Sequence, residues 1–378
     1  MKAPSTVGQG THLARVALSA AIVGVGVGVP AAAASASTTH RASPAITDLA
    51  KGQNYYKGKT LTFVAPDSPG GGFDQWARNL APELAKYLKA TVNVTNIPAG
   101  NTVAGQDAVA HSAANGLTVG WANAGPDVEN TVLGLPALNF NPEREAFLGA
   151  TAPGQTAVVV LNSPACSQFT SFDSLVNGSS TAAKIKETLQ TTGTGTFLML
   201  MLDSAFGIQY QPITGYQSTS AQTQGFTRGD GCLDELPAAT ADSLVTGGKA
   251  RAILLSAPFQ SGAAIASHFA GVPTAAQEYA KHKTVIAGSK ARAAAWATFL
   301  DIQNSTRIFF APVATKTPER DALTWAFQKS MKDPTLLALL RAQGNPTGQE
   351  TGAQAKASYV QFLKDAHREI GVLHSVIG

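Results

Sequence analysis

The chain is poor in cysteine, in charge and in long apolar runs, and each shortage excludes a class of protein. Two Cys among 378 residues exclude a disulfide-built scaffold and a zinc site made of cysteines. Charged residues make up 14%, with 28 Lys and Arg against 24 Asp and Glu, and no three basic residues stand together. A nucleic-acid partner is therefore not expected, because such proteins concentrate Lys and Arg. After the N-terminal region, no uninterrupted apolar run approaches the roughly 18 residues of a membrane-spanning helix.

Catalytic and metal-binding motifs are also missing. The sequence contains no G-x-S-x-G, no H-E-x-x-H and no phosphate-binding G-x-x-x-x-G-K-[ST] motif, and its 7 His residues are scattered without ligand spacing. Gly193-Thr194-Gly195 begins like a dinucleotide fingerprint, but Leu198 stands where the third glycine belongs. We therefore predict a protein that is not an enzyme and has no catalytic residue, no metal ligand and no cofactor.

The N-terminus has the pattern of a secretory signal peptide. Two basic residues precede or flank the start of an apolar stretch, Val16–Val29, which is too short to span a membrane. Ala34-Ser35-Ala36 follows and fits the small-residue rule for cleavage. We predict a signal peptide over 1–36, a flexible leader over 37–58 and an exported protein, periplasmic or extracellular. No Cys lies near the cleavage site, so the lipid-anchored form of export is not predicted.

The mature chain alternates between β-rich and helical segments. A β-rich run at 59–65 is followed by apolar residues at helical spacing from Trp76 to Leu88, and two further β-rich runs flank a helical segment at 105–114. This βαβαβ order predicts an α/β fold with a largely parallel sheet. The later segments repeat the pattern, with strands expected at 157–161, 209–213, 250–256 and 307–312, helices at 197–206, 318–332 and 353–370, and a solvated insertion at 280–306.

Several of the expected strands end in loops of Gly, Ser and Thr that lead into helices. Glycine lets the backbone approach a ligand, and the first N–H groups of a helix are unpaired and partly positive, so such loops favour a carboxylate or phosphate. For each loop the alternative is an ordinary turn with a helix cap. Loops at the same end of parallel strands would form one site. The candidate ligand-binding residues are Ser68, Gly70, Gly71, Gly72, Phe73, Asp74, Asn123, Thr192, Gly193, Thr194, Gly195, Thr196 and Tyr216.

Three side chains in the first loop and helix have alternative roles. A carboxylate beside an anion site would repel the ligand, so we expect Asp74 to cap the helix and fix the loop, with a direct bond to a donor on the ligand as the alternative. Phe73 lies within the Gly loop and is expected to stack on a ligand ring. Trp76 lies on the apolar stripe of the helix and is expected to belong to the core.

The two cysteines, Cys166 and Cys232, stand alone in a chain that we predict to be exported. An oxidising compartment favours a disulfide between them, and two buried thiols are the alternative. A bond closing so long a loop would stabilise the fold by roughly 4 kcal/mol on the chain-entropy model.

The segment Pro69–Leu84 resembles a known signature, P-G-G-x-x-D-x-x-A-R-x-L-A-P-x-L. It belongs to the substrate-binding receptors of tripartite tricarboxylate transporters, the TctC or Bug receptors. The likeness continues in order from about Lys59 to the C-terminus. The further similar segments are 96–100, 115–118, 234–237, 248–252, 272–274 and 310–312.

This resemblance implies a two-lobed periplasmic-binding-protein (type II) fold with a ligand cleft between the lobes. Lobe 1 would comprise 59–154, lobe 2 would comprise 155–311, and 312–378 would return to lobe 1 with the C-terminal helices. The loops at 68–74 and 192–196 would clamp a small carboxylate, which the receptor, a monomer, would deliver to membrane permease subunits.

Three departures from the family pattern bear on the ligand and the fold. Phe73 stands where many members carry a small residue, so the ligand could be an aromatic or bulkier acid instead of a di- or tricarboxylate. Residues 101–103 interrupt the Gly-rich run after Pro98, and 280–306 has no clear counterpart. Two other functions remain open: an exported hydrolase or lyase that uses Asp74 or a loop Ser or Thr, and a sensor of the same fold that feeds a signalling protein.

Overall fold

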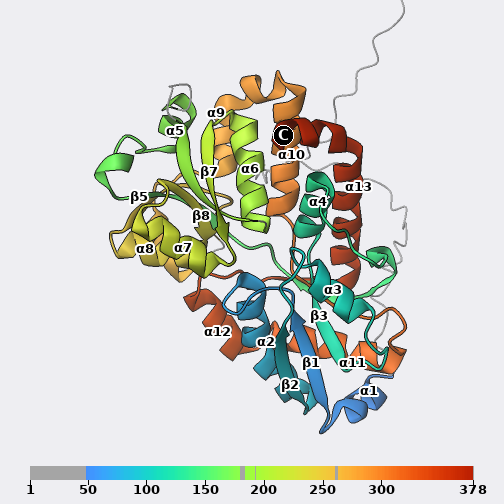
Figure 1. The fold of residues 1–378 in the computed structure, drawn as a ribbon. Helices are drawn as coiled ribbons and strands as arrows, with labels where there is room; N and C mark the ends of the chain where they lie inside the picture. The colour runs from blue at the N-terminus through green and yellow to red at the C-terminus, as the bar shows by residue number, and fades with distance from the viewer. Residues whose placement is uncertain (1–47, 179–183, 192, 260–262, 378) are drawn as a thin grey trace, which may run out of the picture. The chain divides into compact units, whose positions relative to one another are not determined.

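The computed structural model describes residues 48–178, 184–191, 193–259 and 263–377. The expected signal peptide, its cleavage site and the candidate Thr192 lie outside these residues. The described strands form two sheets (Figure 1). The first has the order β11-β4-β10-β3-β1-β2, made of β1 (Thr60–Ala65), β2 (Thr91–Asn96), β3 (Thr118–Ala122), β4 (Ala146–Thr151), β10 (Ile308–Ala311) and β11 (Gln349–Thr351). The second has the order β7-β6-β8-β5-β9, made of β5 (Thr156–Leu161), β6 (Ile185–Gln190), β7 (Tyr210–Tyr216), β8 (Leu233–Pro237) and β9 (Ala250–Leu255).

Helices follow most strands, as the alternating pattern predicts. They are α1 (Leu49–Tyr56), α2 (Gly72–Leu88), α3 (Val103–Ala110), α4 (Ala124–Leu133), α5 (Phe172–Gly178), α6 (Thr194–Phe206), α7 (Thr219–Arg228), α8 (Ala238–Thr246), α9 (Ala275–Ala287), α10 (Lys290–Gln303), α11 (Thr317–Ser330), α12 (Pro334–Ala342) and α13 (Gly352–Ile377). No helix in these described ranges combines the length and the apolar character needed to cross a membrane.

Both sheets are mixed, which corrects the expected largely parallel sheet. β1 runs parallel to β2 and β3, and β6 runs parallel to β7 and β8. Each sheet also contains a strand that enters from the other sheet: β5 is antiparallel to β8 and β9, and β10 is antiparallel to β3 and β4. A parallel neighbour needs a long crossover, whereas these strands arrive through short connections and so run against their neighbours.

The strand pairing also places the two crossings between the sheets. β4 ends in the first sheet and β5 begins in the second, so the first crossing spans 152–155. The expected lobe boundaries put 308–311 at the end of lobe 2, but β10 pairs within the first sheet. The return crossing therefore lies at 304–307, before β10.

Residues 49–56, expected within a flexible leader, form helix α1, which packs on α11. The Tyr56 side chain is fully buried, and its hydroxyl donates a hydrogen bond to the Gly116 carbonyl at 3.0 Å. A Cβ on Gly52 would stand 1.9 Å from the Pro318 carbonyl oxygen, so only glycine allows this contact. Tertiary packing therefore orders a segment whose composition is typical of a leader.

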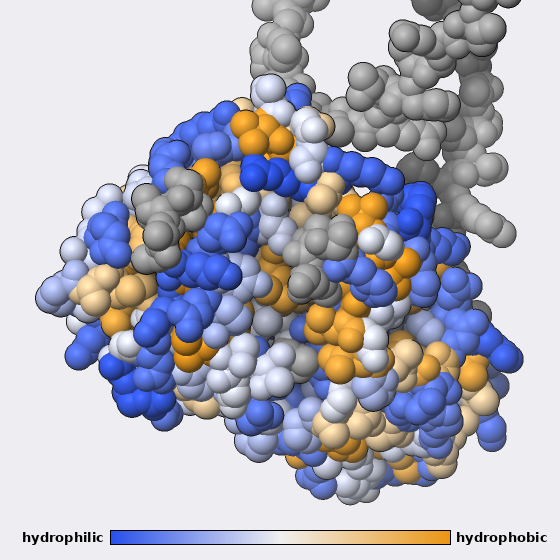
Figure 2. Space-filling model, turned by 45° about the horizontal axis from the view of Figure 1, so that its top comes forward, coloured by the Kyte–Doolittle hydropathy of each residue, from blue (hydrophilic) through white to orange (hydrophobic). Residues whose placement is uncertain are grey.

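The expected solvated insertion at 280–306 is instead helical and half-buried. Its second helix, α10, packs against α6 and α13 and buries Trp296, Phe299 and Ile302. The basic residues that suggested a solvated segment lie on exposed or partly exposed positions, within α9 and at the start of α10. The buried face belongs to the larger of two apolar clusters, and α2 contributes Trp76, as expected, to the other. In the space-filling view, hydrophilic residues occupy much of the face shown, with apolar residues scattered between them (Figure 2).

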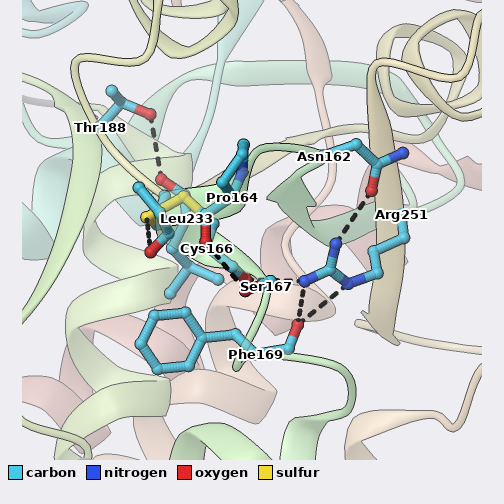
Figure 3. Close-up of a disulfide and its surroundings, with 10 residues drawn as sticks. Asn162, Pro164, Cys166, Ser167, Phe169, Thr188, Leu233 and Arg251 are labelled. Atoms are coloured by element: carbon cyan, nitrogen blue, oxygen red, sulfur yellow. Dashed lines mark hydrogen bonds between the residues drawn. A yellow bond between two sulfur atoms is a disulfide. The ribbon is translucent and has the colours of Figure 1, made fainter.

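A disulfide joins Cys166 to Cys232 with a Cα–Cα distance of 5.4 Å, which confirms the predicted pair (Figure 3). It ties the loop after β5 to the residue just before β8. Arg251 on β9 holds the same loop, because its guanidinium donates to the carbonyl oxygens of Cys166 at 2.8 Å and Phe169 at 2.7 Å. The disulfide therefore positions the start of β8. The charge-assisted hydrogen bonds from Arg251 position the loop after β5, to which the disulfide connects it.

Candidate functional site

A cavity of about 490 Å³ lies where the carboxyl ends of the parallel strands of both sheets meet. Eight of the expected site residues line it: Ser68, Gly72, Phe73, Asn123, Gly193, Thr194, Gly195 and Tyr216. Gly70, Gly71, Asp74 and Thr196 belong to the same loops but do not line it. Polar residues that the sequence analysis missed complete the wall: Asp67, Gln190, Gln217, Gln222, Glu235, Gln303 and Arg307.

The loop before α2 is built around two carboxylates of its own. Asp67 accepts the N–H groups of Ser68 at 2.8 Å and Phe73 at 3.3 Å, so it occupies the N-terminus of α2. Asp74 accepts the Gly70 N–H at 2.8 Å and binds Arg78 at 2.9 Å. Burial would raise the pKa of Asp74, but the bonds from Arg78, Gly70 and Asn96 outweigh it and lower that pKa. Asp74 thus fixes the loop, and its lone pairs are largely used.

The N-terminus of α6 is occupied in the same way. The Gly193 N–H donates to both carboxylate oxygens of Glu129, at 3.0 and 3.1 Å, and Asn101 donates to Glu129 at 2.7 Å. Glu129, on α4, has no exposed surface, and burial raises its pKa to about 8. We expected the N–H groups of the two Gly loops to bind a ligand carboxylate. Asp67 and Glu129 already accept some of them.

Arg307, which the sequence analysis did not single out, is the cation of the cavity. It stands directly before β10, where its carbonyl accepts the Thr151 N–H at 3.0 Å beside the first crossing. Its guanidinium lies over the Phe73 ring, 5.3 Å from the centroid. Its Nε is buried and has no hydrogen-bond partner among the described residues. Burial lowers the pKa of Arg307 to about 10, so it stays charged at neutral pH.

Glycines on two elements lie beside this guanidinium. A Cβ on Gly72 would come within 3.1 Å of one terminal nitrogen of Arg307, and one on Gly154 within 3.5 Å of the other. Gly72 belongs to the first Gly loop and Gly154 to the first crossing. Gly72 therefore makes room for an arginine, whereas the sequence suggested that this glycine lets the backbone approach the ligand, and a Cβ at Gly154 would make only an ordinary contact.

Glu235 on β8 is the second missed residue, and it comes from the other sheet. Its side chain is 5% exposed, and its Oε1 has no hydrogen-bond partner in the described part of the chain. Burial raises the pKa of Glu235 to about 7. Arg307 and Glu235 line the same cavity, yet no ion pair joins them within the described ranges.

The remaining expected residues have structural roles beside the cavity. Asn123 caps α4 by accepting the Gly125 N–H at 2.8 Å, and it donates to the Thr306 carbonyl of the return crossing at 3.1 Å. The Thr196 hydroxyl donates to the Gln190 carbonyl, and the Tyr216 hydroxyl donates to Asp230 at 2.7 Å. Phe73 is mostly buried with Arg307 on its ring, which limits the stacking surface that the sequence suggested.

One group of metal-ligand types comes together elsewhere, within the residues that the structure covers. Asp173, Glu278 and His282 place one ligand atom each within 4.8 Å of the others. The Lys281 ammonium already lies among them, 2.7 Å from Glu278 and 3.4 Å from Asp173. This cluster is an ion-pair network on α9 and α5.

Solved structures with the same arrangement of two sheets are periplasmic binding proteins. BugD is 18% identical, with a TM-score of 0.65, and the match covers 84% of this chain and 99% of that one. This chain has the two-lobed periplasmic-binding-protein fold. MatC from Rhodopseudomonas palustris, solved with bound malate, shares this fold at 18% identity and a TM-score of 0.60, over 85% of this chain and 99% of that one.

A second R. palustris protein, solved with adipate, has 16% identity and a TM-score of 0.64, over 83% of this chain and 97% of that one. The expected two-lobed fold is thereby confirmed. No protein-family model and no curated protein sequence matches the chain.

Proposed function

We propose that this chain is an exported solute-binding receptor of the TctC or Bug type. It captures a small carboxylate between its lobes and delivers it to a membrane permease of the tripartite type. The observation that carries the proposal is Arg307, a partly buried guanidinium in the wall of the cavity, whose buried Nε has no hydrogen-bond partner among the described residues. A planar guanidinium matches a carboxylate with two parallel hydrogen bonds, and its charge favours an anion. The malate- and adipate-bound neighbours support this ligand class.

The two crossings give this site a hinge. Arg307 ends the return crossing, its carbonyl accepts the N–H of Thr151 directly before the first crossing, and Gly154 and Ser305 bring both crossings to the cavity wall. A ligand held by residues of both sheets stabilises the closed form through its extra contacts there. We therefore place the carboxylate on Arg307, with the free N–H groups of the two Gly loops in support.

The exported hydrolase or lyase has less support in the site. Asp74 would have to act as the acid or base, but it is engaged by Arg78, Gly70 and Asn96 and does not line the cavity. Hydrogen bonds to the charged form make it a weak base. We therefore propose binding without turnover.

Titration calorimetry of the purified protein with malate, adipate and aromatic acids tests this function. We expect one site per chain, and we expect Arg307→Met to lose about 2–5 kcal/mol of binding free energy, as truncation of a buried charge pair does. Arg307→Lys should recover part of it, because the charge stays and the fork is lost. If no carboxylate binds, or if a bound carboxylate is converted to a product, the proposal is wrong.

A further inference from the structure

The cavity has two charged poles that come from different sheets. Arg307 precedes β10 of the first sheet, and Glu235 lies on β8 of the second. Each has a buried atom without a partner among the described residues, Nε of Arg307 and Oε1 of Glu235. A buried charged group is costly unless it is paired. Asp67 also lines the cavity and lies close enough to Arg307 to raise the pKa of the guanidinium, whereas Glu235 has no cationic partner among the described residues. Two acids and one Arg in the wall therefore point to a ligand that carries a positive charge for Glu235 as well as a carboxylate for Arg307.

We propose that the carboxylate captured by this site also carries an ammonium group. Its carboxylate binds Arg307 and its ammonium binds Glu235, so the ligand is an amino acid and not a dicarboxylate. This inference rests on the proposed function and narrows its ligand class. The ligand would bridge the two sheets, and the closed form would be the one in which both poles are paired.

The position of Glu235 on β8 supports its proposed role as the residue that binds the ligand ammonium. β8 otherwise presents Leu233 and Leu236 to the core, and neighbouring side chains point to opposite faces of the sheet. Asp234 faces the other side, where Gln222 donates to it. Glu235 faces the cavity instead, beside the second Gly loop: a Cβ on Gly195 would stand 2.4 Å from its Oε2.

Gly195 therefore makes room for an acid, just as Gly72 makes room for Arg307. A dicarboxylate bound to Arg307 would bring its second carboxylate toward Glu235, where like charges repel. An ammonium at that point gains a charge-assisted hydrogen bond and satisfies the orphaned oxygen. The opposite charges of Arg307 and Glu235 should thus favour an amino acid over a dicarboxylate of the same length.

Calorimetry with matched ligand pairs tests the inference on the unaltered protein. Each pair has the same number of methylene groups and differs in one end group: β-alanine with succinate, γ-aminobutyrate with glutarate, and δ-aminovalerate with adipate. We expect the amino acid of at least one pair to bind ten times more tightly than its dicarboxylate. The comparison needs no variant, so it does not depend on how a mutation affects folding.

The variant Glu235→Gln should reverse this preference, because it keeps the shape and removes the charge. Glu187→Gln is the control: Glu187 is a buried acid on β6 of the same sheet that does not line the cavity, so the preference should stay. If carboxylates bind but no amino acid exceeds its partner, or if Glu235→Gln leaves the preference unchanged, this inference is overturned while the proposed function stands. If neither ligand class binds, both are overturned.

Discussion

The disulfide between Cys166 and Cys232 should supply a large share of the stability of the lobe that contains the second sheet. Replacing both residues with alanine opens a loop of 66 residues in the unfolded chain. The chain-entropy relation gives about 4 kcal/mol for a loop of this length. Since whole domains are stable by only about 5–15 kcal/mol, such a loss would be visible in any unfolding experiment.

The native loop should nevertheless keep its place without the bond. Arg251 donates to the carbonyl oxygens of Cys166 and Phe169, and the Leu161 N–H donates to the Cys232 carbonyl at 3.0 Å. These contacts do not involve the sulfur atoms. We therefore expect the double alanine variant to fold, with the loss of stability arising in the unfolded chain.

Urea unfolding followed by circular dichroism and Trp fluorescence measures the effect. Trp296 packs in the same apolar cluster as Cys166, whereas Trp76 and Trp121 belong to the other cluster. A Trp296→Phe variant identifies which part of the fluorescence change reports on the cross-linked lobe. That transition should move to lower urea, and the other should move less.

The unaltered protein in reducing agent is the matched control, because it breaks the bond but keeps both sulfur atoms. Reduced protein and the double alanine variant should agree to within about 1 kcal/mol, the contribution of the missing buried atoms. If the bond is verified as broken and the unfolding free energy falls by less than about 1 kcal/mol, the loop-entropy argument is refuted for this chain.

Three further predictions concern the glycines and the buried acids. Gly71→Ala places a Cβ 1.9 Å from Asp67 Oδ2, so this carboxylate of the cavity wall has to move; calorimetry should show carboxylate affinity reduced about tenfold, and the melting temperature should fall because the Ser68 and Phe73 N–H groups lose their acceptor. Gly371→Ala lies in open space on α13 and should raise the unfolding free energy by about 0.5–1 kcal/mol, measured by thermal unfolding; a decrease would contradict the helix assignment. Burial raises the pKa of Glu129 from 4.5 to about 8, so the folded state binds its proton more tightly. The urea midpoint should therefore fall as pH rises from about 5 to 8, and Glu129→Gln should flatten that slope.

Local signals in the sequence were sufficient for much of the fold. The apolar stripe of α2 identifies a helix because its spacing repeats every 3.6 residues or so, whatever the helix packs against. The same holds for the βαβ alternation and for the Gly-rich loops. Tertiary packing overrode composition at α1, where Gly52 allows close contact with α11, and at α10, where Trp296 and Phe299 are buried.

The charged residues of the site left no comparable signal. Arg307 is a single charge between Thr306 and Ile308, and Glu235 stands beside Asp234 with nothing local to show which of the two acids faces the cavity. Glu129 lies 64 positions from Gly193, the residue whose N–H it accepts. Contacts at such separations depend on how the two sheets come together, which a local pattern does not encode.

The sequence by itself identified part of the strands and helices, the position of the glycine loops and a pair of cysteines that can be oxidised. These features follow from backbone preferences and apolar spacing within a few residues of each position. Only the tertiary structure decided which charges face the cavity. Asp67 and Glu129 occupy the helix N-termini that seemed open to a ligand, and Arg307 and Glu235 each keep a buried atom that no described residue hydrogen-bonds. A buried polar group is satisfied by whatever the fold brings within hydrogen-bond distance, so its free partners emerge only when the chain is packed.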